Sequence, residues 1–289
     1  SSLNPLKLLN DGQSINCNAK ITSHWQDKSI KWLTLDFFAA NQSNQYSLVI
    51  GSNKNHHSAG QIGIATSCTN NVLAINTNDS IFSFDIISSR FSWISKQAGC
   101  EIRSGYLELF AQGDELLQTT VTEHKCQNFY NLADDSVQKV TLQLSLEHHH
   151  ITANTDLNST LIFTIYNKPS LLNIEHRLHN PKAAIHPNGH WDLGDESSIQ
   201  FRSAGMVFEL PVITSLELKT HENDQWHEPP TSPFTLQQFS SGGQSWQSPV
   251  HVDKNNVVAL KQQGAELTSS DGSITSLDRA LPSIMIPCY

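Results

Sequence analysis

The apolar residues of this chain follow the alternating pattern of β-strands. In Ser29–Phe38, for example, Leu33, Leu35 and Phe37 fall on one face while Trp32 falls on the other. This period of two is the spacing that a pleated strand requires. Nowhere do apolar residues recur at helical spacing for three turns, so we expect almost no helix. The sequence therefore predicts an all-β protein.

The predicted strands are short near the start of the chain and longer after residue 80. They cover residues 19–25, 29–38, 46–50, 61–65, 71–75, 81–87, 90–95, 101–110, 117–124, 137–147, 159–166, 171–179, 198–201, 206–210 and 212–219. Asn167–Ser170 reads as a hairpin connection. Evenly spaced strands with turn signals between them indicate a sandwich or a barrel. We place a domain boundary at the turn Asn76–Asp79, which divides the 289 residues into 1–77 and 78–289.

The charge and hydropathy of the chain argue against a nucleic-acid partner and against a membrane span. Charged residues make up only 16% of the chain, the formal net charge is -9, and the 18 Lys and Arg residues never form a basic block. Recognition of nucleic acid needs a clustered positive surface, so we expect no nucleic-acid partner. There is also no apolar run long enough to span a bilayer.

The five cysteines, Cys17, Cys68, Cys100, Cys126 and Cys288, lie far apart and include no C-x-x-C pair. Such spacing suits neither a zinc ribbon nor a disulfide scaffold. We therefore expect isolated buried thiols. One disulfide is the alternative if the chain is exported.

The segment Asn180–Phe201 holds the densest cluster of unusual side chains, with two His, a Trp and two Asp between predicted strands. Two prolines stiffen it and two glycines allow backbone angles closed to other residues, which predicts a long ordered turn. One interpretation is a structural loop, in which Trp191 fills a core and the Asp side chains bond nearby backbone amides. The other is a sugar or cation site.

A metal site is one candidate within this segment. His186, His190 and Asp192 are spaced i, i+4, i+6, and Asp195–Glu196 can add oxygen ligands. Zinc needs three or four converging ligands and calcium needs six or more oxygens. On a loop the spacing does not fix convergence, so a divalent cation stays the one candidate cofactor and we otherwise expect none.

Sugar contact is the other candidate. Aromatic faces stack on the apolar side of a sugar ring while carboxylates and amides bond its hydroxyls. The residues that we select for this role are Trp191, Asp192, Asp195, Trp246 and His251. The alternative is that both Trp side chains are core residues that hold neighbouring loops.

Two further groups are interpreted as structural. Trp25, Trp32 and Trp93 each lie inside a strand pattern, which predicts core packing. The run Glu147–His150 lies near a strand end, where alternation splits its side chains between two faces. We expect it to be a solvated strand end.

Four segments carry a resemblance to a known family. They are Trp25–Phe37, Leu178–Asp195 followed by Ser198, Gln238–Trp246 with Ser248 and His251, and Asp278–Ala280. The second, with His-Pro-Asn-Gly-His-Trp-Asp-Leu-Gly-Asp, is the most specific. Together they resemble the exo-rhamnogalacturonan lyase-like family that also contains the YetA-like bacterial proteins, except that Lys28 stands where the family has Gly.

The resemblance implies a small RIFT-related β-barrel over residues 1–77, followed by a large antiparallel β-sandwich over residues 78–289. In full-length members an α/α toroid comes next, where lyase chemistry is expected. This chain stops at Tyr289 before any helical repeat. We therefore expect the toroid to be missing and no catalytic residue to lie in this chain.

These observations leave three functions open. The first is the non-catalytic amino-terminal portion of a polysaccharide lyase-like protein of pectin or rhamnogalacturonan type, which presents a polysaccharide or oligosaccharide to the toroid. The second is a stand-alone carbohydrate-binding or structural assembly module. The third is an active enzyme. A periplasmic or extracellular location is expected, because such polysaccharides lie outside the cell.

Overall fold

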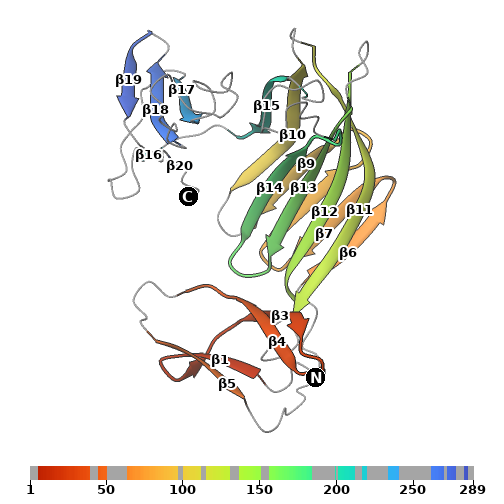
Figure 1. The fold of residues 1–289 in the computed structure, drawn as a ribbon, viewed down its shortest axis with the longest axis vertical. Helices are drawn as coiled ribbons and strands as arrows, with labels where there is room; N and C mark the ends of the chain where they lie inside the picture. Colours follow the sequence, from red (N-terminus) through yellow and green to blue (C-terminus); the bar gives the residue numbers. More distant parts are fainter. Residues whose placement is uncertain are drawn as a thin grey trace, which may run out of the picture. The chain divides into compact units, whose positions relative to one another are not determined.

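The computed structural model describes only part of the chain. The described residues are 6–39, 45–50, 64–96, 100–111, 115–130, 137–150, 156–183, 199, 201–211, 217–219, 234–240, 262–269, 272–277 and 283–285. Every regular element in these ranges is a β-strand, and the sheets are antiparallel (Figure 1). The prediction of an all-β protein is therefore confirmed. Within the same ranges no helical segment has the length and hydropathy of a membrane span.

The chain divides into two compact units. The first comprises residues 1–179 and 203–209, and the second comprises residues 180–202 and 210–289. Most of the described residues, and the two largest sheets, belong to the first unit.

The first unit begins with five short strands. They are β1 (Leu6–Asn10), β2 (Gln13–Ser14), β3 (Asn18–His24), β4 (Ile30–Asp36) and β5 (Tyr46–Ile50). β2, β1 and β5 form one sheet, while β3 and β4 form a hairpin. Leu33, Leu35 and Phe37 pack against a small core that includes Leu8 and Cys17. The face that the sequence pattern selected is therefore the face that the hairpin buries.

Two of the three tryptophans that were predicted to lie in a core do not. Trp25 is 56% exposed and Trp32 is 63% exposed, so the prediction is wrong for both, whereas Trp93 is buried as predicted. The alternation explains why Trp32 is exposed, because it places this side chain on the other face of the strand from Leu33 and Leu35. In the described residues the small core covers the Leu33 and Leu35 face, while Trp32 stays exposed.

The rest of the first unit is a β-sandwich. Its larger sheet has the order β15-β10-β9-β8-β7-β6, and its smaller sheet has the order β11-β12-β13-β14. The bounds are β6 (Ile64–Thr69), β7 (Val72–Thr77), β8 (Ser80–Asp85), β9 (Arg90–Ser95), β10 (Glu101–Ala111), β11 (Gln118–Tyr130), β12 (Val137–His149), β13 (Asp156–Tyr166), β14 (Leu171–His179) and β15 (Phe201–Glu209). An antiparallel sandwich is thus present as predicted, but it is formed by β6 to β15 and not by residues 78–289, because residues 210–289 belong to the second unit.

The sandwich includes strands that lie before the predicted boundary at residue 77. β6 and β7 are hydrogen-bonded neighbours of β8 in the larger sheet. Residues 78–79 form the tight turn between β7 and β8, where the Thr77 hydroxyl accepts a hydrogen bond from the backbone N–H of Ser80 (2.8 Å). This turn also bonds the β13–β14 connection, because the Asn78 N–H donates to Asn167 Oδ1. The turn therefore lies inside one sandwich, and β6 and β7 belong with the strands that follow.

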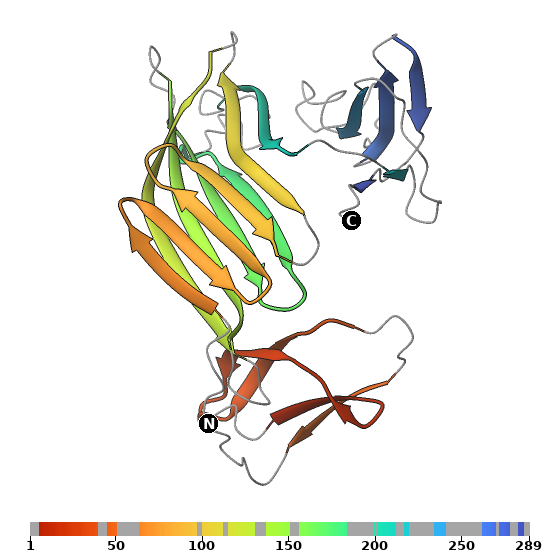
Figure 2. The same cartoon turned by 180° about the vertical axis from the view of Figure 1, so that it is seen from behind.

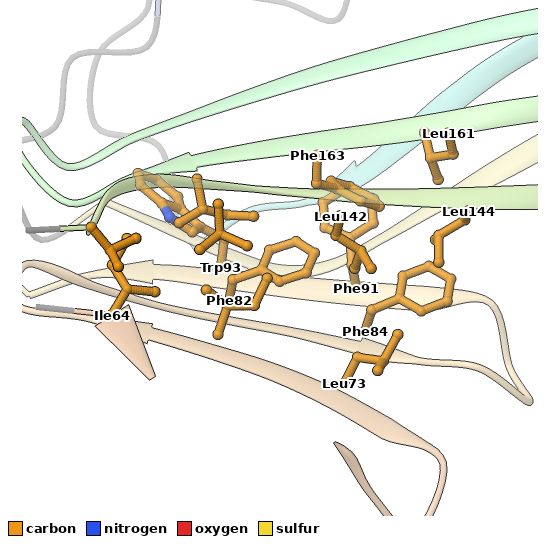
Figure 3. Close-up of a cluster of buried hydrophobic side chains, with 14 of the residues drawn as sticks. Ile64, Leu73, Phe82, Phe84, Phe91, Trp93, Leu142, Leu144, Leu161 and Phe163 are labelled. Atoms are coloured by element: carbon orange, nitrogen blue, oxygen red, sulfur yellow. The ribbon is translucent and has the colours of Figure 1, made fainter. Parts of the chain in front are cut away.

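An aromatic cluster joins the two sheets of the sandwich (Figure 3). Phe163 on β13 lies 4.8 Å, between ring centroids, from both Phe82 on β8 and Phe91 on β9. All three rings are almost completely buried. Burying a side chain of this size contributes about 1.5–3 kcal/mol, and edge-to-face ring pairs add about 0.5–1.5 kcal/mol.

Two small sheets lie in the described part of the second unit. β16 (Glu217–Lys219) pairs with β20 (Ser283–Met285), and β17 (Phe234–Ser240), β18 (Gln262–Ser269) and β19 (Ile274–Leu277) form the other sheet. None of the strands after residue 219 was predicted.

The four cysteines within the described ranges differ in state. Cys17 is a buried free thiol, as expected, but Cys68 and Cys126 are exposed free thiols. Cys100 is disulfide-bonded. The expectation of isolated buried thiols is therefore wrong for Cys68 and Cys126, which lie on edge strands of the two sheets. It is also wrong for Cys100, whose disulfide is the alternative that the sequence left open.

The close packing of Gly105 allows a test of how tightly this core is packed. Gly105 on β10 lies opposite Phe91, and a Cβ atom there would overlap the buried Phe91 ring. We expect Gly105→Ala to lower the free energy of unfolding by about 1–3 kcal/mol, the usual cost of overpacking, measured by urea denaturation. The matched control is Gly205→Ala on β15, where nothing lies within 4 Å. Equal stability of the two variants would contradict this account of the core.

Candidate functional site

The residues selected from the sequence lie outside the described part of the chain. This holds for the sugar-contact candidates Trp191, Asp192, Asp195, Trp246 and His251, and for the metal candidates His186, His190 and Asp192. Both sites therefore stay predictions. Among the described residues, no three His, Cys, Asp or Glu side chains form a group that could hold a metal ion.

The described residues contain a different candidate, a cavity of about 460 Å³ in the first unit. Its walls come from three places in the sequence: residues 14–18, residues 36–38 at the end of β4, and the sandwich residues Gln138, Tyr166 and Lys168–Pro169. The volume lies within the range of about 300–1,000 Å³ that is usual for small-molecule sites. The β13–β14 hairpin connection, predicted from the sequence, supplies one wall.

Aromatic rings form the apolar wall of the cavity. Phe38 contacts Tyr166 edge to face, with 5.2 Å between the ring centroids. The ring of the preceding residue, Phe37, lies against the Tyr46 ring with 5.0 Å between the centroids. This contact holds the backbone next to Phe38 in place. Phe38 is 48% exposed, so part of its ring remains open to a ligand. Burial raises the pKa of Tyr166, which keeps its phenol neutral and able to donate a hydrogen bond.

Asn18 provides an unpartnered polar group at this cavity. The residue is only 7% exposed, and its side-chain oxygen is buried with no hydrogen-bond partner in the part of the chain that the structure describes. A buried polar group without a partner costs about 1–3 kcal/mol. Asn18 lines the cavity, but this oxygen itself has less than 1 Å² of exposed surface, so a ligand hydroxyl supplies the missing donor only when the cavity wall shifts to uncover it.

An ion pair holds the cavity wall together. Lys139 on β12 pairs with the carboxylate of Asp36, which lines the cavity 103 positions earlier in the chain. The Lys139 ammonium also lies 4.9 Å from the centroid of the Phe129 ring and 5.4 Å from that of Tyr166. Both rings belong to its cross-strand neighbours. Burial lowers the pKa of Lys139, and the carboxylate and the two rings offset the cost of burying its charge.

A second cavity, of about 260 Å³, lies at another place in the sandwich. Its wall includes Tyr106, but the Arg90 guanidinium covers that ring at 4.1 Å from the centroid. Arg90 is in turn bonded to Ser104 and Glu209. The aromatic face is therefore already occupied, which makes this cavity the weaker candidate.

The histidines at the end of β12 divide between two faces, as the alternation predicts. His149 lies on the exposed side near Glu147, at 3.4 Å. His148, however, is completely buried, so the expectation of a solvated strand end is wrong for this residue. Its Nδ1 is hydrogen-bonded to the Thr119 hydroxyl (2.9 Å) and its Nε2 to the Ser159 hydroxyl (2.7 Å). His148 is thus a satisfied core residue.

No motif or local pattern in the sequence pointed to the cavity. Asn18, Phe38 and Tyr166 lie at strand ends, and no motif links them. The residues meet only because the β4 end and the β12–β13 ladder come together in three dimensions.

The ion pair yields a stability prediction. We expect Asp36→Asn to lower the free energy of unfolding by about 1–2 kcal/mol, because Lys139 keeps a buried charge without its counter-ion. Lys139→Met should cost less, since it removes the charge and keeps the apolar stem. Urea denaturation of the two variants measures the difference. A larger loss for Lys139→Met would contradict the assigned role of Asp36.

His148 yields a pH prediction. Burial, followed by the nearby His176 and His149, lowers the pKa of His148 from 6.5 to about 4. The unfolded chain then binds a proton at a pH where the folded chain does not, so stability is full above pH 6.5 and is lost as the pH falls toward 4. We expect a loss of about 2–3 kcal/mol between pH 7 and 4.5 from this group, measured by urea denaturation. In His148→Gln this pH dependence should be weaker, and an unchanged slope would refute the assignment.

Known proteins do not add to this picture. No protein-family model matches the chain, and no curated protein matches it. The resemblance to the exo-rhamnogalacturonan lyase-like family therefore remains a hypothesis from the four sequence segments.

Proposed function

We propose that this chain is a non-catalytic carbohydrate-binding module that presents a polysaccharide or oligosaccharide to a catalytic toroid in a larger polysaccharide lyase-like protein. The observation that carries the proposal is a cavity lined by aromatic rings and by Asn18, whose buried side-chain oxygen has no partner among the described residues. Sugar sites combine rings that stack on C–H faces with amides and carboxylates that bond hydroxyls. Phe38, Tyr166, Asn18 and Gln138 supply this combination.

The ionisable groups of the cavity support binding rather than chemistry. Elimination from a uronate needs a base and a group that neutralises the carboxylate. The Asp36 carboxylate is already paired with the Lys139 ammonium. The Cys17 thiol is neutral, because burial raises its pKa to about 11, and the Tyr166 pKa is also raised by burial. Lys168 also lines the cavity and is a cation that could neutralise a carboxylate, but none of Asp36, Cys17 and Tyr166 is set up as the general base that elimination also needs.

The lyase-like context rests on the sequence resemblance alone. The cavity supports the carbohydrate part of the proposal, and the four segments support the presentation role. The second site predicted from the sequence, at Trp191 and Trp246, would extend the same function if it also contacts sugar.

A glycan array with the full chain, followed by calorimetric titration of the glycans that bind, tests the proposal. We expect Asn18→Ala and Phe38→Ala to weaken binding about tenfold each, which corresponds to the loss of about 1.4 kcal/mol. Ile87→Ala is the matched control, because Ile87 is 76% exposed and does not line the cavity. It should bind as the wild type does.

Three results would count against the proposal. Absence of binding to every glycan would refute carbohydrate recognition. Full binding by both cavity variants, with loss in Trp191→Ala, would move the site to the segment chosen from the sequence. New absorbance of unsaturated uronate on incubation with pectic polymers would refute the non-catalytic assignment.

A further inference from the structure

Two exposed free thiols lie at one edge of the sandwich. Cys68 is on β6, the edge strand of the larger sheet, and Cys126 is on β11, the edge strand of the smaller sheet. Seen from the front and from behind, β6 and β11 lie along the same edge of the sandwich (Figures 1 and 2). The open edge between the two sheets thus carries one thiol on each side.

The strand register directs both thiols into the gap between the sheets. Cys68 lies opposite Leu73 on β7, and Cys126 lies opposite Leu142 on β12. Directly opposed residues of an antiparallel pair project to the same face. Leu73 and Leu142 both project into the shared core, where they are 5% and 0% exposed. Cys68 and Cys126 therefore project from the inner faces of their sheets, each toward the opposite sheet.

Electrostatics agree with this placement. The pKa of Cys126 is raised first by burial and then by the nearby Cys68, whose thiolate would repel a second negative charge. Such repulsion acts over short distances only.

We propose that Cys68 and Cys126 form an oxidation site, in which a small-molecule disulfide such as oxidised glutathione converts the two thiols into one disulfide between the sheets. One cysteine thiolate attacks the glutathione disulfide, which forms a mixed disulfide and releases one glutathione thiolate. The second cysteine then attacks the mixed disulfide at the protein sulfur and releases the second glutathione. The protein loses two electrons and two protons, and oxidised glutathione becomes two glutathione thiols.

The disulfide would link the two sheets of the sandwich at their open edge. It closes a long loop between β6 and β11, and a loop of this kind restricts the unfolded chain. We expect oxidation to raise Tm by roughly 5–10 °C. Because the thiols are exposed, the reaction needs no unfolding.

Peptide mapping of the full chain tests the proposal. The purified protein is treated with oxidised glutathione under native conditions, free thiols are blocked, and the protein is digested with trypsin without reduction. Cleavage after Lys54, Arg90, Lys125 and Lys139 leaves each cysteine alone in its peptide, Cys68 in 55–90 and Cys126 in 126–139. The expected product is these two peptides joined, with the mass of their sum less two hydrogens, from monomeric protein.

A relocated thiol provides the matched control. The double variant Cys68→Ser, Ser67→Cys keeps the number of thiols but moves one to the opposite face of β6, since neighbouring residues of a strand alternate. It should form the linked peptide at least tenfold more slowly and show no rise in Tm on oxidation. Separate glutathione adducts on both wild-type peptides, unmodified thiols, disulfide-linked dimers, or equally fast linkage in the relocated variant would each overturn the proposal.

Discussion

The contact of Phe163 with Phe82 and Phe91 is the interaction on which the sandwich depends. It brings rings from two sheets into one core, which also holds apolar residues of both central strands of the smaller sheet: Val140, Leu142, Leu144 and Leu146 on β12 and Leu161 and Ile165 on β13. A shift of one residue in either strand would turn this apolar set toward solvent. The register of the smaller sheet is therefore fixed over its length, including at Lys139 and Tyr166, which are cross-strand neighbours.

That register places the sandwich residues of the candidate cavity at the end of the sheet. Tyr166 is the last residue of β13, and Gln138 and Lys139 lie near the start of β12. Lys139 then reaches Asp36, so that the end of β4 and the sandwich share one wall. A buried ammonium is costly, and the carboxylate together with two aromatic rings makes the arrangement tolerable. Asp36, the aromatic rings of Phe38 and Tyr166, and Asn18 all line the same cavity.

The sequence allowed most strands of the first unit to be predicted, because their apolar residues alternate strictly. The Asn167–Ser170 hairpin connection was also predicted correctly. The boundary was placed at Asn76–Asp79, yet a turn with these residues suits a tight hairpin inside one sheet equally well. Trp25 and Trp32 were assigned to a core because large aromatic side chains are usually buried. Residue type alone, however, does not show which face of a two-stranded hairpin other residues cover.

The candidate site was less accessible to sequence reasoning. The cavity combines Asn18, Phe38 and Tyr166, which lie far apart in the sequence, and only tertiary packing brings such residues together. His148 was misjudged for a related reason, since two hydroxyls on neighbouring strands satisfy its ring in the core. The sites predicted from local clusters of His, Trp and Asp lie outside the described residues, so their prediction still rests on the sequence pattern.

The central claim is that the Asn18 cavity holds a sugar. The most direct measurement is a crystal structure of the chain with an oligosaccharide that binds it. The account predicts a sugar ring against Phe38 and Tyr166, with one hydroxyl within hydrogen-bond distance of the Asn18 side-chain oxygen. A bound oligosaccharide elsewhere on the protein, with this cavity holding none of it, would contradict the account.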